Sequence, residues 1–99
     1  MAHFVLIHGS SHGAWCWDKV IPALTARGHH ADAIDLPGHG NDPTPRDTVS
    51  MADYVARVLE NLAPDTVLVG HSFGGFPITL AASKAPERVR GLVYLCALL

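Results

Sequence analysis

Charged residues are scarce in this sequence, and they form no run of one sign. Asp, Glu, Lys and Arg make up 16% of the residues, against about 25% in an average soluble domain. The net charge is only −2. Proteins that bind nucleic acid or anionic membranes concentrate Lys and Arg on one surface. We therefore expect neither nucleic acid nor a membrane among the partners of this chain.

Long apolar segments are missing as well, and cysteine is rare. No stretch approaches the roughly 18 apolar residues of a membrane-spanning helix, and the apolar stretch 4–7 is too short for a secretory signal. The expected location is therefore the cytoplasm. The two cysteines, Cys16 and Cys96, are expected to be buried thiols rather than a disulfide or a metal site.

Apolar runs and segments with helical spacing alternate along the chain. Strands are expected at 3–8, within 30–36 and ending at Asp35, at 66–69 and at 89–95; helices are expected at 17–28, 50–62 and 73–85. Such alternation predicts an α/β fold whose mostly parallel sheet carries helices on both faces, a three-layer arrangement. No linker divides the chain, so residues 1–99 are interpreted as part of one domain.

The most informative motif follows the third predicted strand. Residues 70–74, GHSFG, fit the pattern GxSxG, in which the serine of a sharp strand-to-helix turn is a nucleophile. The residues two before and two after that serine must be small to let the backbone fold back, and here they are Gly70 and Gly74. The alternative is that Ser72 only caps a helix. The flanking strand and helix patterns favour the nucleophile.

Two further segments extend this pattern into a family resemblance. Together with residues 70–75, the segments 8–17 (HGSSHGAWCW) and 35–40 (DLPGHG) resemble the N-terminal portion of an α/β-hydrolase, within the group that contains methylesterase-like esterases and hydroxynitrile lyases. The resemblance covers nearly all 99 residues and implies the strand order second, first, third, fourth. It also implies that the acid and the histidine of the catalytic triad follow later strands, because the family order is Ser, acid, His. By this comparison the chain stops where the cap domain would begin.

The resemblance assigns roles to single residues. Ser72 is the expected nucleophile, and the backbone N–H groups of Phe73 and Ser10 are the expected oxyanion donors. The candidate substrate-binding residues come from the same loops: Gly9, Ser11, His12, Trp15 and His71. Structural roles stay open for some of them. Strand alternation points the side chain of His71 away from that of Ser72, and His12 and Trp15 could instead support the loops or the core.

No metal or cofactor is expected. His8 and His12 are four residues apart, but they lie on a strand end and a Gly-rich loop, not on one helix face. Residues 38–40 (GHG) are followed by Pro43 where a dinucleotide motif needs a third glycine, and Gly9 lacks the downstream Gly-Lys-Ser/Thr of a P-loop. The sequence suggests no partner for His29, His30 or His39.

Three functional hypotheses follow. The first is hydrolysis of small carboxylic esters through an acyl-enzyme on Ser72. The second is a hydroxynitrile lyase, but the lyases of this group carry Thr where this chain has Gly9, which favours the esterase. The third is a non-catalytic binding protein or a fragment. The fourth predicted strand would be an exposed edge in residues 1–99 alone. That stretch by itself is therefore expected to be inactive and to associate, with the rest of its domain or with copies of itself.

Overall fold

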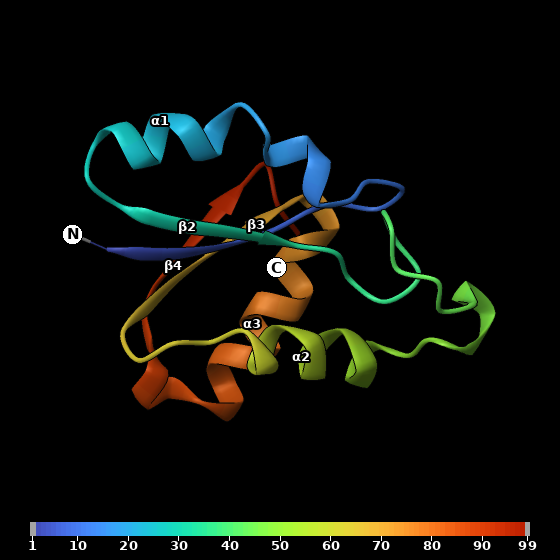
Figure 1. Ribbon diagram of the computed structural model, residues 1–99. Helices are drawn as coiled ribbons and strands as arrows, with labels where there is room; N and C mark the ends of the chain where they lie inside the picture. The colour runs from blue at the N-terminus through green and yellow to red at the C-terminus, as the bar shows by residue number, and fades with distance from the viewer. Residues whose placement is uncertain (1, 99) are drawn as a thin grey trace.

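The computed structural model describes residues 2–98 and contains one four-stranded parallel sheet flanked by helices (Figure 1). The strand order is β2-β1-β3-β4, as the family resemblance implies. The strands are β1 (His3–Ile7), β2 (His30–Ile34), β3 (Thr66–His71) and β4 (Val89–Leu95), and the helices are α1 (Val20–Ala26), α2 (Met51–Glu60) and α3 (Gly75–Lys84). The predicted α/β class with a parallel sheet is confirmed.

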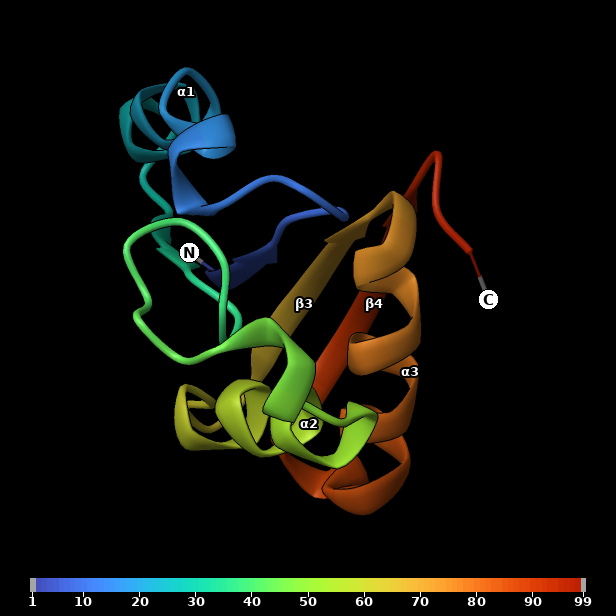
Figure 2. The same cartoon turned by 90° about the vertical axis from the view of Figure 1, so that its right-hand side faces the viewer.

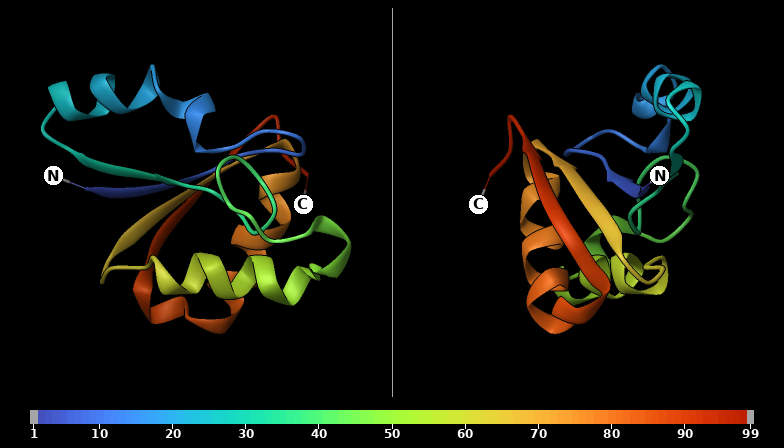
Figure 3. Two further views of the ribbon diagram at one scale, coloured as in Figure 1. Left: turned by 45° about the vertical axis from the view of Figure 1, so that its right-hand side comes forward. Right: turned by 90° about the vertical axis from the view of Figure 1, so that its left-hand side faces the viewer.

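The helices lie on both faces of the sheet, which gives three layers (Figures 2 and 3). Side chains of β1 alternate between the layers. Val5 and Ile7 belong to the larger core with α2 and α3, whereas Leu6 packs with Trp17 and the α1 side. The larger core contains ten buried residues. The first three strands are thus sandwiched between helices, and their carboxyl ends point toward a common edge.

The first predicted helix is wrong in its extent. Instead of one helix over 17–28, a short 3-10 helix at Ala14–Trp17 is followed by α1 at Val20–Ala26. Pro22 explains the break, because its ring has no N–H and clashes with the carbonyl four residues earlier. A helix can therefore contain Pro22 only within its first turn. Gly28 terminates the segment with a φ of +84°, as expected for a glycine just after a helix.

The other boundaries shift by a few residues. β2 ends at Ile34, which pairs with Ile7, the last residue of β1. Asp35, the next residue, accepts a hydrogen bond from the N–H of Ala14 at 2.7 Å. β3 runs two residues further than predicted, to His71, and a 3-10 turn at Ser72–Gly74 precedes α3. The capping box of α2 is present: the N–H of Ser50 donates to Asp53 Oδ2 at 2.9 Å.

β4 is an edge strand in the described residues, as expected for residues 1–99 alone. The apolar residues Leu92, Val93 and Leu95 are 38–47% exposed, and among residues 2–98 β4 has a neighbouring strand on one side only. Cys96 is exposed and Cys16 half-buried, so the prediction of two buried thiols is wrong for Cys96. Both are free thiols. Within residues 2–98 we find no helix long and apolar enough to cross a membrane.

Candidate active site

Ser72 occupies a strained turn between β3 and α3. Its φ is +53°, a left-handed conformation that non-glycine residues rarely adopt. The two flanking glycines are required by close contacts. A Cβ atom at Gly70 would lie 2.7 Å from the carbonyl oxygen of Gly74, and one at Gly74 would lie 2.7 Å from that of Ile7. This is the geometry in which a serine hydroxyl projects from the carboxyl edge of a parallel sheet.

The loop after β1 packs directly against this turn. A Cβ atom at Gly9 would lie 3.2 Å from the Cβ of Ser72 and 3.2 Å from the carbonyl oxygen of His71. That contact brings Ser10, the next residue, to the side of the nucleophile. The loop turns sharply here, because Ser11 has a φ of +59° and the N–H of His12 bonds to the carbonyl of Gly9.

The two backbone N–H groups predicted to hold an oxyanion are available. Phe73 is the second residue of a 3-10 helix, and N–H groups at a helix start have no acceptor within the helix. The N–H of Ser10 has no protein partner among residues 2–98. α3 begins at Gly75, so its N-terminal dipole also faces this position. The arrangement can stabilise negative charge that develops beside Ser72.

His8 and His39, two of the histidines near this edge, are tied into the structure. The N–H of Leu36 donates to His8 Nε2 at 3.0 Å, so His8 Nδ1 carries the proton and donates to the carbonyl of Gly9 at 2.8 Å. His39 is buried with Nδ1 3.0 Å from the carbonyl oxygen of Pro37. Among the described residues, no side chain makes a hydrogen bond to the Ser72 hydroxyl.

A cavity of about 230 Å³ lies beside the turn and collects several candidate residues. Its lining includes His12 and His71 from the predicted set, and also residues that the sequence analysis did not assign to the site: Cys16, Trp17, Val20 and Leu95. Trp15 is 58% exposed and not part of this lining, although its ring lies 5.5 Å from that of His12. Ser11 is also exposed. Trp15 and Trp17 are two residues apart and lie on different faces, as their spacing predicts. Trp17 is the buried one of the two.

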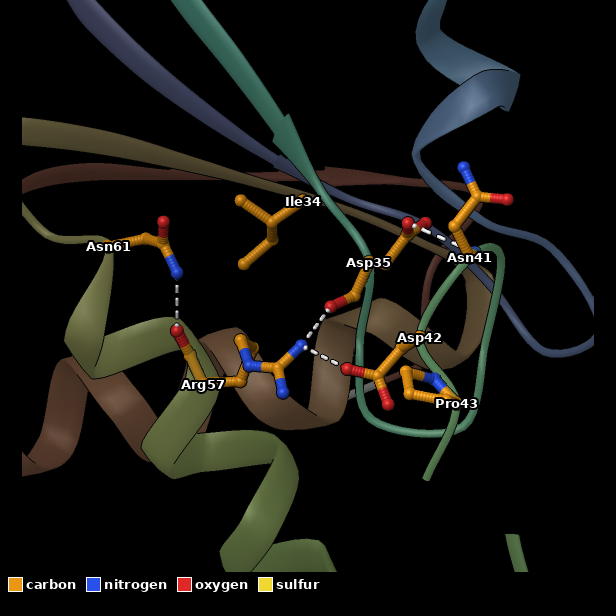
Figure 4. A pocket seen from close by; sticks show the side chains of 7 residues that line it. All are labelled: Ile34, Asp35, Asn41, Asp42, Pro43, Arg57 and Asn61. Atoms are coloured by element: carbon orange, nitrogen blue, oxygen red, sulfur yellow. Dashed lines mark hydrogen bonds and ion pairs between the residues drawn. The ribbon is translucent and has the colours of Figure 1, made fainter. Parts of the chain in front are cut away.

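A larger cavity, of about 410 Å³, lies at the carboxyl end of β2 and is bounded by polar groups (Figure 4). Arg57 donates to the carbonyl oxygen of Asp35 at 2.7 Å and to Asp42 Oδ2 at 3.0 Å. The N–H of Gly38 donates to the Asp42 carboxylate, which holds the pKa of Asp42 well below its usual range. These bonds fold the Gly- and Pro-rich loop 36–46 onto α2. Among the residues that line this cavity, Arg57 and Asp42 form an ion pair and Asn61 donates to the carbonyl of Arg57. None of the lining residues belongs to the Ser72 turn.

One group of side chains in residues 2–98 is close enough together to hold a metal ion: His3, His30 and Asp32. It lies at the amino ends of β1 and β2, at the opposite end of the sheet from Ser72. His8 and His12, whose spacing the sequence analysis considered, are not part of it. The group is therefore separate from the candidate active site.

The buried position of His8 predicts a pH-dependent stability. Burial lowers the pKa of His8, so the folded protein keeps this side chain neutral while the unfolded chain takes up a proton near the ordinary value of about 6.5. The stabilising contribution is thus complete above that pH and is lost as the pH falls below it. We expect the unfolding free energy to decrease between pH 7 and 5.5, with a His8 contribution of at most about 1.4 kcal/mol per pH unit. Denaturant unfolding of wild type and His8→Gln across this range measures the difference in slope, and equal slopes would contradict the prediction.

Comparisons with known proteins agree with this geometry. The family model described as "Alpha/beta hydrolase family" matches residues 4–99. Methylesterase 1 of Arabidopsis thaliana is 45% identical over 102 residues, which cover 96% of this chain and 39% of that protein. The probable esterase PIR7A of Oryza sativa subsp. indica is 43% identical over 101 residues, with 96% and 38% covered.

A solved structure extends the likeness to three dimensions. The crystal structure of polyneuridine aldehyde esterase superimposes with a TM-score of 0.92 at 36% identity, covering 100% of this chain and 41% of that one. The chain thus spans about two fifths of the length of the relatives it matches. The matched part contains the sheet, the Ser72 turn and the Gly9 loop. The chain belongs to the alpha/beta hydrolase family.

Proposed function

We propose that the complete protein hydrolyses small carboxylic esters through an acyl-enzyme on Ser72. The observation that carries this proposal is the left-handed backbone of Ser72 at the carboxyl end of β3, with the Gly9 loop packed against it. In the first step the Ser72 oxygen bonds to the ester carbonyl carbon, its proton goes to a general base, and the alcohol leaves with a proton. In the second step water attacks the acyl carbon, the acid is released and the Ser72 hydroxyl is restored.

The chain's own contribution to these steps is to orient the nucleophile and to stabilise charge. The N–H groups of Phe73 and Ser10 would donate to the oxyanion of each tetrahedral intermediate, where fixed donors typically contribute about 10²–10³ each in rate. Gly9 is needed between them because a side chain there would crowd Ser72 and His71. We assign Ser11, His12, Trp15 and His71 to the walls around the substrate, and the cavity lining supports this assignment for His12 and His71.

The proton acceptor is assigned to sequence outside residues 1–99. His8 Nδ1 is engaged by a backbone carbonyl and His8 Nε2 by the N–H of Leu36, so this side chain is not free to act as the base. The relatives are more than twice as long as this chain. The stretch 1–99 alone is accordingly proposed to be inactive, since an unassisted serine hydroxyl is a poor nucleophile at neutral pH.

The names of the related proteins favour an ester as the substrate. Those named above are called methylesterase or esterase, and a methyl ester of a small acid is the substrate class that fits those names. The lyase alternative is less well supported. The contacts around Gly9 leave no room for a threonine side chain unless Ser72 or the backbone of His71 shifts by a few tenths of an ångström.

The proposal is tested by labelling and turnover in the complete protein that carries this sequence. A fluorophosphonate probe should modify the peptide that contains Ser72, as read by mass spectrometry, and p-nitrophenyl acetate should be hydrolysed. Mandelonitrile should release no cyanide above the uncatalysed background. Cyanide release comparable to ester turnover would reverse the order of the two hypotheses, and labelling of a different serine would contradict the assignment of the nucleophile.

A further inference from the structure

The amino ends of β1 and β2 bring three side chains with metal-ligating atoms together, far from the Ser72 turn. His3 Nε2 lies 3.0 Å from Asp32 Oδ2, and His30 Nε2 lies 3.2 Å from the same oxygen. The three potential ligand atoms all lie within 4.8 Å of one another. The two imidazole rings are adjacent, with centroids 4.8 Å apart.

The register of the parallel strands accounts for this cluster. His3 pairs with His30 across β1 and β2, and Val5 pairs with Asp32. Side chains two residues apart on a strand point to the same face, so His30 and Asp32 lie on the face of the sheet that carries His3. These positions belong to the first half of strands that are otherwise apolar.

The backbone around the cluster is fixed by two hydrogen bonds. The N–H of His30 donates to the carbonyl of Ala2 at 2.9 Å, and the N–H of Ala2 donates to His29 Nδ1 at 3.0 Å. The side chain of His3 is 20% exposed, whereas those of His30 and Asp32 are 62% and 51% exposed. The ligand atoms are thus held on a rigid strand pair and remain accessible to an ion from solution.

We propose that His3, His30 and Asp32 bind a divalent transition-metal ion of the zinc type, which links the edge strand β2 to β1. Two imidazole nitrogens and one carboxylate oxygen are a donor set that suits zinc and its neighbours, whereas magnesium and calcium prefer oxygen alone. With metal–ligand bonds of about 2.0–2.2 Å, the ligand atoms of a tetrahedral site lie roughly 3.4 Å apart. The two separations from Asp32 Oδ2, 3.0 Å and 3.2 Å, are close to those of such a site, and the two imidazole nitrogens need only move within the 4.8 Å that bounds the cluster. On binding, each imidazole presents the Nε2 lone pair to the metal in place of its hydrogen bond to Asp32: a neutral ring does so with its proton on Nδ1, and a protonated ring releases one proton to solvent, with water completing the coordination.

The cluster lies apart from the groups that would carry out the acyl transfer. An ion here would act on stability and not on the acyl transfer, because Ser72 follows the opposite ends of the strands. Without a metal, the same groups form a hydrogen-bonded triad, and the experiment has to separate the two states.

The test is zinc binding by the complete protein, purified without a histidine tag and freed of metal with a chelator. Isothermal titration with ZnCl₂ should show one site that His30→Gln and Asp32→Asn weaken by at least about tenfold, the lower end of what even outer ligands contribute. Zinc at 100 times its Kd should raise the unfolding midpoint by about 5 °C. EDTA should reverse the shift, and MgCl₂ should not reproduce it.

Two matched variants separate this site from other surface groups. Glu60→Gln changes an exposed carboxylate at the end of α2, and Asp47→Asn changes an exposed carboxylate in the 3-10 helix at Arg46–Thr48. Both should bind zinc with wild-type affinity. Equal zinc affinity in wild type, His30→Gln and Asp32→Asn would overturn the proposal, as would a midpoint shift that persists in Asp32→Asn. Circular dichroism checks that each variant is folded. Ester turnover should be the same with and without zinc, so the result of the zinc test does not depend on the proposed esterase function.

Discussion

Replacing Ser72 with alanine is expected to reduce ester hydrolysis by the complete protein by about 10⁴–10⁶-fold. The removal of a serine nucleophile abolishes the acyl-enzyme and leaves only the contributions of binding and of the oxyanion donors. Phe73 and Ser10 would retain their N–H groups in this variant. Turnover of p-nitrophenyl acetate and labelling by a fluorophosphonate should therefore disappear together, whereas the unfolding midpoint should change little.

Ser10→Ala is the matched control for this experiment. It also removes a serine hydroxyl from the candidate site, but it leaves the backbone N–H that we assign to the oxyanion. Its kcat/KM should remain within a few-fold of the wild-type value. Undiminished turnover in Ser72→Ala would contradict the nucleophile assignment, and a large loss in Ser10→Ala would show that a side chain, not a backbone donor, acts at that position.

Gly74→Ala is expected to cause the second-largest effect, on stability and activity together. The new methyl carbon would lie 2.7 Å from the carbonyl oxygen of Ile7 and 2.8 Å from that of His8. Both are backbone atoms that cannot turn aside, so the Ser72 turn or the end of β1 must move. Overpacking of this kind typically costs about 1–3 kcal/mol. Because the moving parts carry the nucleophile, kcat should also fall by on the order of 10²-fold.

Gly91 provides a control of the same chemistry. It lies in β4, and a Cβ atom there would meet no other atom within 4 Å. Gly91→Ala should therefore leave turnover unchanged and should not lower the unfolding midpoint. Chemical denaturation and kcat measured on both variants check the pair. Wild-type stability and activity in Gly74→Ala would mean that the contact between the Ser72 turn and β1 is looser than described.

The parts of the fold that the sequence predicted are those with strong local signals. The capping box at Ser50, the glycine after α1 and the near-continuous apolar run of β4 each act within a few residues, and all three were found where expected. The strand order was reached through the family resemblance and not through the pattern. A parallel sheet is determined by contacts between distant strands, to which periodicity is insensitive.

The errors arose where tertiary contacts override local preference. The end of β2 at Ile34 follows from its pairing with the last residue of β1, Ile7. The break before α1 is the exception, because it is a local effect of Pro22 that helical spacing alone does not reveal. The cavity residues Cys16 and Leu95 are far apart in sequence, so no motif connects them. The His3, His30 and Asp32 cluster escaped notice for the same reason. It exists only because β1 and β2 pair in one particular register.

The position of β1 between β2 and β3 has a consequence for how the protein folds as it is synthesised. β1 is made first, but its partner β3 emerges after two further helical segments, since His3 pairs with Thr66. Contacts between such distant residues close large loops, and they slow folding. The close contact between Gly74 and the backbone of Ile7 and His8 can form only after β1 has paired with β3. We therefore expect the strained turn at Ser72 to form late, after the β1–α1–β2 unit and only when β3 has paired with β1.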